Sequence, residues 1–424
     1  MKRFQVLALL LVVGLMFTSV ASAQNIDFGG KTVTFVGGVD KLEDQRKSGL
    51  VAQAEEMFNV KIEVLTVPAD QAVETMVTRL ISGDSEYDVW AIDNGDTFYP
   101  LIASDALLPL NDVLGDEYYA MPRKYANPAV DAFSIGDKVY VLGSFEILPN
   151  GATTWFVFNK DIIEAEGLAD PYELYFNGEW NWDNFREMAI AATKDLDGDG
   201  EPDQYGMENL YTWAYLVASN GVNFFVPNEE GRLIYNWNDE GVLQAIEFGR
   251  QLNYIDKVNT TSGGFTEGRT LFAFQATWQL DGLLTADVNW GLLPFPKGPS
   301  AKNHSMYTGF IGGLGLPMNS AQPKEMAALL DFLFAPANWE TYAEDRYAEL
   351  VNTYCPDIQS ARIFTEFLPI YGSEGEILNY PLTAEEVWNA YSSAMDGERT
   401  PAEAMNSVVQ VGQSYVDDLL GFTK

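Results

Sequence analysis

The chain of 424 residues contains one cysteine, Cys355, and one histidine, His304. A single cysteine cannot form a disulfide within the chain, so the fold must be stabilised by its core or by a bound ion. A single histidine excludes most zinc sites and most catalytic sites that pair histidine with serine or cysteine. His304 stands in a polar segment, where a solvated loop histidine is expected. If the protein is an enzyme, a catalytic pair of carboxylates, as in a glycosidase, is the kind of active site that this composition still allows.

Basic residues are also scarce. Lysine and arginine number 25 against 61 aspartates and glutamates, which gives a formal net charge of −36. A surface of this sign repels phosphate backbones and anionic lipid, which argues against nucleic-acid and membrane-surface roles.

The apolar run at residues 6–17 is too short for a membrane span, which needs about 20 residues. Lys2 and Arg3 precede it and Ala21-Ser22-Ala23 follow it, which is the order of a secretory signal peptide. We expect residues 1–23 to be removed and the protein to be exported to the periplasm or another extracytoplasmic space. No cysteine lies near the cleavage point, so no lipid anchor is expected.

The chain does have the material for a large core, with 47% hydrophobic and 13% aromatic residues. Its length fits two or three domains. After the leader, strand patterns at residues 31–37, 60–67 and 87–92 alternate with helical patterns at 44–58 and 70–81. This order predicts a βαβαβ unit with a mainly parallel sheet, and hence an α/β fold.

Ligands of open α/β sheets bind beyond the carboxyl ends of the strands. Trp90 lies near the end of the third predicted strand, and Asp93 and Asn94 directly follow that strand. An aromatic face beside a carboxylate suits a sugar, whose C–H faces stack and whose hydroxyls form hydrogen bonds. The alternative is that Trp90 belongs to the core and that Asp93 caps the next helix.

A second pattern places carboxylates at every second residue. Asp195, Asp197 and Asp199 take positions one, three and five of an EF-hand-type loop, and Gly200 takes the position of its sharp turn. The predicted calcium ligands are Asp195, Asp197, Asp199, Glu201, Asp203 and Gln204. The bidentate glutamate of a true EF-hand is missing, because position twelve is Gly206. A solvated Asp-Gly turn is the alternative.

An ordered set of motifs spans the mature chain. It comprises SGD (82–84) with YDV (87–89), LLPL (107–110), GDKVY (136–140), FNKDII (158–163), EGL (166–168), NWDNF (181–185), the acidic loop ending QYG (204–206), WG (290–291) with PFPKG (294–298), and GFIGG (309–313). In this order the chain resembles the extracellular solute-binding proteins of ABC importers, family 1, which includes maltose-binding and other sugar-binding proteins.

The resemblance implies a periplasmic-binding-protein-like fold: two α/β lobes with a ligand cleft between them, of type II, which close by a hinge. The implied N-terminal lobe comprises residues 24–149 and 297–340, and the C-terminal lobe comprises 150–296 and 341–424.

The resemblance also implies ligand-binding residues. In the first lobe these are Trp90, Asp93 and Asn94, where Asn94 replaces an arginine of the maltose-binding proteins. In the second lobe they are Glu208, Tyr211, Trp213, Trp278 and Trp388. Ala276 replaces a glycine before Trp278, and the spacing around Trp388 departs from the family pattern.

The function that follows is binding of a sugar or oligosaccharide and its delivery to the transmembrane subunits of an ABC permease. No catalysis and a monomeric state are expected, with Ca²⁺ as a structural ion. Two alternatives stay open: a binding protein for a cationic solute such as a polyamine, and a secreted glycosidase that uses two carboxylates.

Overall fold

The computed structural model of the protein describes residues 26–93, 95–115, 118–119, 130, 133–142, 153–208, 213–228, 232–260, 264–305, 307–308, 312–334, 348, 350–367 and 384–420. The predicted signal peptide lies outside these residues. The chain forms two compact units. The first is drawn from Met1–Asp93, Thr97–Leu148 and Gly312–Glu344, and the second from Asn94–Asp96, Pro149–Ile311 and Asp345–Lys424. Among the described residues, none of the helices combines the length and apolarity that a membrane crossing requires.

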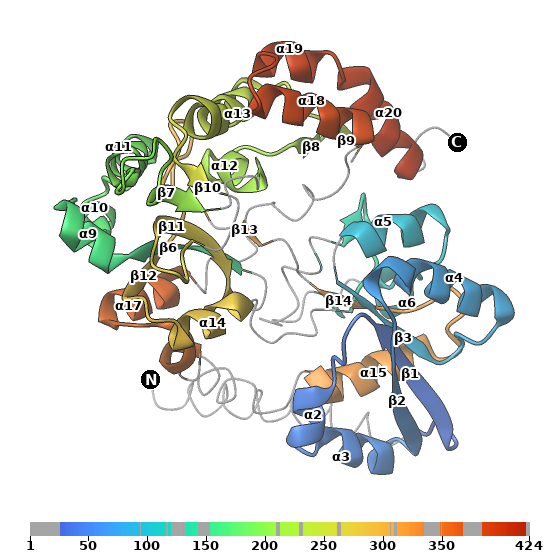
Figure 1. Ribbon diagram of the computed structural model, residues 1–424. Coiled ribbons are helices and arrows are strands. Elements are labelled where there is room, and N and C mark those ends of the chain that lie inside the picture. Colours follow the sequence, from blue (N-terminus) through green and yellow to red (C-terminus); the bar gives the residue numbers. More distant parts are fainter. Residues whose placement is uncertain are drawn as a thin grey trace, which may run out of the picture. The chain divides into compact units, whose positions relative to one another are not determined.

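The first unit is built on a four-stranded sheet in the order β14-β3-β1-β2 (Figure 1). Strands β1 (Lys31–Gly37), β2 (Val60–Thr66) and β3 (Asp88–Ile92) are parallel, whereas β14 (Gly313–Gly315) is antiparallel to β3. The accompanying elements are α2 (Glu43–Lys47), α3 (Leu50–Met57), η1 (Ala69–Gln71), α4 (Ala72–Ser82), α5 (Gly95–Ala103), α6 (Asn111–Leu114), β4 (Ser134–Ile135), β5 (Lys138–Val139) and α15 (Pro323–Phe334). The βαβαβ order predicted from the sequence is confirmed.

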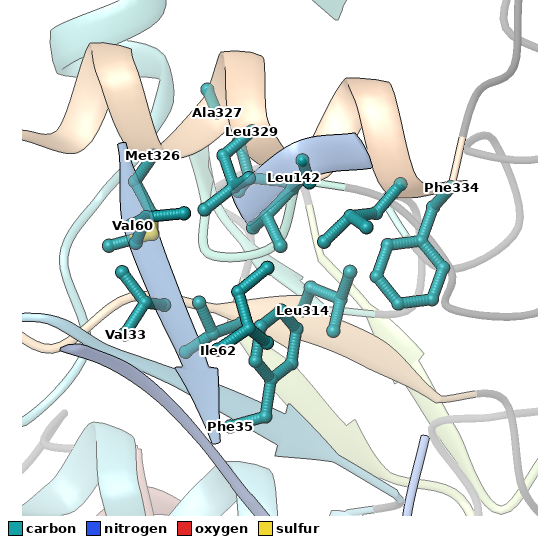
Figure 2. Packing of buried hydrophobic residues seen from close by; sticks show 14 of the residues in the cluster. Val33, Phe35, Val60, Ile62, Leu142, Leu314, Met326, Ala327, Leu329 and Phe334 are labelled. Atoms are coloured by element: carbon teal, nitrogen blue, oxygen red, sulfur yellow. The ribbon is translucent and has the colours of Figure 1, made fainter. Parts of the chain in front are cut away.

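Helix α15 returns to this sheet from far along the chain and completes its core. Figure 2 shows Val33, Phe35 and Ile62 of the strands beside Met326 and Phe334 of α15. All five side chains are at most 8% exposed. A fully buried side chain of this kind contributes about 1.5–3 kcal/mol, so this face of the sheet depends on α15.

The second unit contains a mixed sheet in the order β10-β7-β11-β6-β12, with β13 also paired to β6. Strand β6 runs antiparallel to β11, β12 and β13, whereas β7 runs parallel to β10 and β11. The strands are β6 (Thr153–Asn159), β7 (Tyr205–Glu208), β10 (Asn259–Thr260), β11 (Thr270–Ala276), β12 (Trp290–Leu293) and β13 (Tyr307–Thr308), with a separate pair of β8 (Phe225–Pro227) and β9 (Leu233–Tyr235). The helices are α9 (Lys160–Glu166), α10 (Pro171–Phe176), α11 (Trp182–Ala192), α12 (Trp213–Ser219), α13 (Glu240–Arg250), the π-helix η2 (Gln251–Ile255), η3 (Thr277–Gln279), α14 (Leu280–Thr285), α17 (Ile358–Phe367), α18 (Glu385–Met395), α19 (Pro401–Asn406) and α20 (Val409–Leu419).

Two asparagine side chains cap the starts of helices α9 and α11 in this unit. The side chain of Asn159 accepts hydrogen bonds from the backbone N–H groups of Asp161 and Ile162, at 2.9 and 3.3 Å. Asn181 accepts one from Asn184 N–H at 3.1 Å. Such caps satisfy N–H groups that a helix leaves without partners, and they fix the points where the chain leaves β6 and enters α11.

The unit boundaries differ from those predicted. Residues 297–311 belong to the second unit, so the chain passes to the first unit between Ile311 and Gly312. The reason is strand pairing: β13 pairs with β6, and Gly298 N–H donates to Ser219 O at 2.8 Å. The proline-rich segment at residues 294–299, which contains the predicted boundary, lies within the second unit.

Strand β7 passes so close to helix α11 that it accommodates only glycine at Gly206. A Cβ atom there would lie 2.2 Å from the carbonyl oxygen of Ala189. We expect Gly206→Ala to lower the free energy of unfolding by about 3 kcal/mol, the upper end of the usual cost of overpacking. Thermal unfolding with Gly282→Ala as control measures this, because nothing lies within 4 Å of a Cβ at Gly282 in α14. Equal Tm values for the two variants would contradict the close approach.

Candidate functional site

In the first unit, two charged side chains meet at the edge of the sheet where the parallel strands end. Lys41 follows β1 and Asp93 follows β3, and Lys41 Nζ lies 2.7 Å from Asp93 Oδ1. The Asp93 side chain is 31% exposed. A Cβ on Gly38 would lie 3.5 Å from Asp93 Oδ2, so a glycine backbone passes directly beside the carboxylate. This edge therefore offers a hydrogen-bond donor and an acceptor where open α/β sheets bind ligands.

The sequence also predicted Trp90 and Asn94 as ligand-binding residues of the N-terminal lobe. Trp90 is fully buried, which favours the alternative that it belongs to the core. Asn94 lies outside the described residues. Lys41 was missed by sequence reasoning, although its place four residues after the end of β1, the strand that pairs with β3, is a signal that could have identified it.

In the second unit, neighbouring parallel strands bring two predicted residues toward one edge of the sheet. Glu208 ends β7 and pairs in register with Ala273 of β11. Trp213 starts α12 after β7, and Trp278 lies in η3 directly after β11. Parallel strands end at the same edge, so Glu208 and Trp278 lie toward that edge.

The Glu208 carboxylate already has a structural partner. Its Oε2 atom accepts a hydrogen bond from Phe265 N–H at 2.6 Å and so fixes the segment that leads into β11. The side chains of Trp213 and Trp278 and the whole of Tyr211 lie outside what the structure describes. Trp388 lies on α18, where its side chain is 40% exposed and its ring centroid is 5.5 Å from that of Tyr391.

The remaining described tryptophans are structural. Trp155, Trp180 and Trp237 are fully buried, and Trp290 is 4% exposed. His304 is not a solvated loop residue, because its Nδ1 atom lies 2.9 Å from the carbonyl oxygen of Phe295 and burial lowers its pKa.

The acidic loop brings three carboxylates together. One oxygen each of Asp195, Asp197 and Asp203 lies within 4.8 Å of the others, so the exposed cluster could hold a metal ion. Asp199 Oδ1 instead accepts a hydrogen bond from Glu201 N–H at 2.9 Å. All-oxygen donors of this kind suit a hard cation.

Backbone N–H groups hold the loop in shape. Asp195 accepts hydrogen bonds from Gly198 and Gly200 at 2.6 and 2.9 Å. Asp203 Oδ2 accepts from Leu196 and Asp197 at 2.8 and 3.1 Å. The carboxylates are thus oriented inward by the chain itself.

Gln204 anchors the base of this loop. Its side-chain nitrogen donates to Ala192 O at 2.7 Å and to Glu166 Oε1 at 3.2 Å. Lys194 forms an ion pair with the same Glu166, and its backbone exchanges hydrogen bonds with that of Gln204. The loop is therefore tied to α9 and α11.

The second unit also carries a groove of about 700 Å³. Trp182, Leu243 and Phe248 form part of its apolar wall, and the rings of Trp182 and Phe248 stack with centroids 4.3 Å apart. Arg186 also lines this groove, and its guanidinium group donates hydrogen bonds of 2.6 and 2.9 Å to the Asp256 carboxylate. None of the candidate ligand residues is among the described residues that line it.

Comparison with known proteins gives a consistent result. A family model described as bacterial extracellular solute-binding protein matches residues 43–338. The galactooligosaccharide-binding protein of Bacillus subtilis (strain 168) is 21% identical over 397 residues, which cover 88% of each chain. A cyclo/maltodextrin-binding protein complexed with maltotetraose is similar with a TM-score of 0.65 and 17% identity, over 91% of this chain and 97% of that one. UgpB from Mycobacterium tuberculosis in complex with glycerophosphocholine matches with a TM-score of 0.62 and 15% identity, over 91% and 98%. The predicted α/β periplasmic-binding-protein fold is confirmed.

The hydrogen bonds of the acidic loop predict how it responds to acid. The N–H groups of Gly200 and Gly198 lower the pKa of Asp195 below that of an ordinary aspartate. Stability from a lowered pKa is fully present above the unfolded value, about 3.9, and is lost as pH falls through the folded value. In calcium-free buffer, we expect the Asp195 carboxyl carbon to titrate below pH 3.9 by NMR, with Asp195→Asn as the assignment control. A pKa at or above the unfolded value would contradict the loop geometry.

Proposed function

Because the chain belongs to the bacterial extracellular solute-binding proteins, we propose that this ABC transporter solute-binding protein binds a sugar or oligosaccharide and delivers it to the importer's membrane subunits. The family binds solutes and is non-enzymatic, so the glycosidase alternative is set aside. Residues 1–23 would direct export, without a lipid anchor, and the protein would act as a monomer.

The observation that carries the proposal is the likeness to oligosaccharide-binding proteins over nearly the whole chain. The Bacillus subtilis relative, named for galactooligosaccharides, covers 88% of both chains. A protein of similar fold that holds glycerophosphocholine shows that the fold alone does not fix the ligand. The residues at the two strand edges therefore have to supply the specificity.

Those residues favour a neutral, hydroxyl-rich ligand. Asp93 and Glu208 supply carboxylate oxygens that form charge-assisted hydrogen bonds with sugar hydroxyls. We assign the aromatic faces to Tyr211, Trp213 and Trp278, with Trp388 as a further candidate, and a side-chain amide to Asn94. Trp90, buried in the first unit, would support Asp93 from within the core. Lys41 would add a donor held in place by Asp93.

A cationic solute is the second candidate. The net charge of −36 and the carboxylates of Asp93 and Glu208 would attract it, and aromatic faces bind ammonium groups. Binding of a cation would weaken strongly as salt rises, whereas binding of a neutral sugar would change little.

The sugar proposal is tested by isothermal titration of the protein with galacto- and malto-oligosaccharides and with polyamines. We expect binding of a saccharide in the micromolar range or tighter, insensitive to salt. Asp93→Asn should raise Kd at least about tenfold, since a charge-assisted hydrogen bond is worth about 1.5–3 kcal/mol.

The matched control is Asp112→Asn in the same unit. Asp112 also forms an ion pair with a lysine, Lys138, at 2.7 Å, but more of its side chain is exposed. Unchanged Kd in the control separates loss of a ligand contact from loss of an ion pair. Salt-sensitive polyamine binding without saccharide binding would replace the first proposal by the second.

We further propose that the acidic loop binds Ca²⁺ as a structural ion. Asp195, Asp197 and Asp203 would provide the main oxygens, with Asp199, Glu201 and Gln204 as further ligands. An ion there would neutralise the repulsion between the close carboxylates and brace the second unit rather than contact the solute.

Removal of calcium should destabilise the protein. At a free Ca²⁺ concentration 100 times Kd, binding stabilises the folded state by about 2.7 kcal/mol. We expect a chelator to lower Tm by several degrees, and Asp197→Asn to abolish this difference. Asp287→Asn, an exposed aspartate outside the loop, should keep it. An unchanged Tm on chelation of the wild type would exclude a stabilising ion.

A further inference from the structure

A buried hydrogen bond fixes the short helix that carries Trp278. The indole N–H of Trp155 donates to Thr277 Oγ1 at 3.0 Å, and both side chains are at most 1% exposed. Trp155 lies on β6, and Thr277 is the first residue of η3. The contact therefore ties the sheet to the residue directly before Trp278.

The strand register explains why this contact forms. Trp155 pairs with Gln275 of β11, so Thr277, two residues on, is its diagonal neighbour on the same face. The last register pair of the two strands is Thr154 with Ala276. The hydroxyl of Thr277 thus binds β6 at the first position beyond the ladder, where the chain turns into η3.

Two further contacts restrict the conformation of the chain where β11 leads into η3. The ring of Trp155 stacks on Phe364 of α17, with centroids 4.8 Å apart and planes 19° apart. The side chain of Gln279 accepts a hydrogen bond from Ala276 N–H at 2.8 Å and so closes η3 from its other end. Trp278 stands between two residues whose positions are set by these bonds.

We propose that Thr277 and Trp155 are positioning residues, which hold η3 in the geometry that Trp278 needs to bind the solute. The inference rests on the proposed function, in which Trp278 supplies an aromatic face. Neither positioning residue touches the ligand, because both are buried. Their effect is preorganisation: without the bond, part of the binding energy would be spent on ordering η3.

Thr277→Val removes the hydroxyl and keeps the shape, whereas Thr277→Ser keeps the hydroxyl. We expect Thr277→Val to raise the Kd for the saccharide about tenfold and Thr277→Ser to retain wild-type affinity. In a Trp278→Ala background, Thr277→Val should cause no further loss, because residues that act through one another are not additive.

A matched control removes the same kind of bond elsewhere in the second unit. The indole N–H of Trp182 donates to Ser219 Oγ at 2.9 Å, and both residues are buried. Ser219→Ala should lower Tm about as much as Thr277→Val does, yet leave Kd unchanged.

The outcomes are distinct. Equal Kd values for wild type, Thr277→Val and Ser219→Ala overturn the positioning role while the proposed function stands. Equal weakening by Thr277→Val and Ser219→Ala also overturns it, because a general loss of stability then accounts for the effect. If the wild type binds no saccharide, the proposed function fails and this inference fails with it.

Discussion

The antiparallel pairing of β6 is the interaction on which the rest of the second unit depends. This strand pairs with β11, β12 and β13. Helix α9 follows it directly, and the side chain of Asn159, the last residue of β6, caps this helix. Phe156 packs against Trp180, Phe185 and Phe272 with ring centroids 5.0–5.6 Å apart. Pairing with β6 fixes the position of β11, and therefore also the positions of the residues that follow β11.

Several of the scarce cations join distant parts of the chain. Arg186 binds Asp256, Arg232 binds Asp417, and Lys160 binds Asp357, whose other oxygen accepts from Ser360 N–H at 2.7 Å. Pairs that are partly buried are worth more than exposed ones, because solvent screens them less. Because acidic residues outnumber basic ones by 61 to 25, the protein has a strongly negative net charge, which disfavours an anionic solute.

Structure that depends only on neighbouring residues can be predicted from the sequence. Asn159 and Asn181 cap helices because a side-chain oxygen one residue before a helix satisfies its first N–H groups, and this needs no distant partner. The carboxylate spacing of the acidic loop likewise placed Asp195 and Asp197 next to each other. Contacts between distant segments are more difficult to predict. The pairing of β13 with β6 joins residues about 150 positions apart, and the proline-rich sequence before β13 contains no signal that identifies β6 as its partner.

The candidate site shows the same difference between local features, which the sequence predicts, and long-range contacts, which it does not. Asp93 was found from its place after a strand, but its pairing with Lys41 depends on the order of strands in the sheet. Trp90 was selected for its aromatic ring, and only packing shows that this ring is buried. The tie between Trp155 and Thr277 joins residues 122 positions apart and follows from strand register, which the sequence does not state.

The late arrival of α15 has a consequence for synthesis. Strands β1, β2 and β3 are complete once Ile92 has been made, but the helix that buries Val33, Phe35 and Ile62 begins only at Pro323. A nascent chain therefore carries an open apolar sheet face through most of its translation, and its first unit cannot finish folding until Phe334 has left the ribosome.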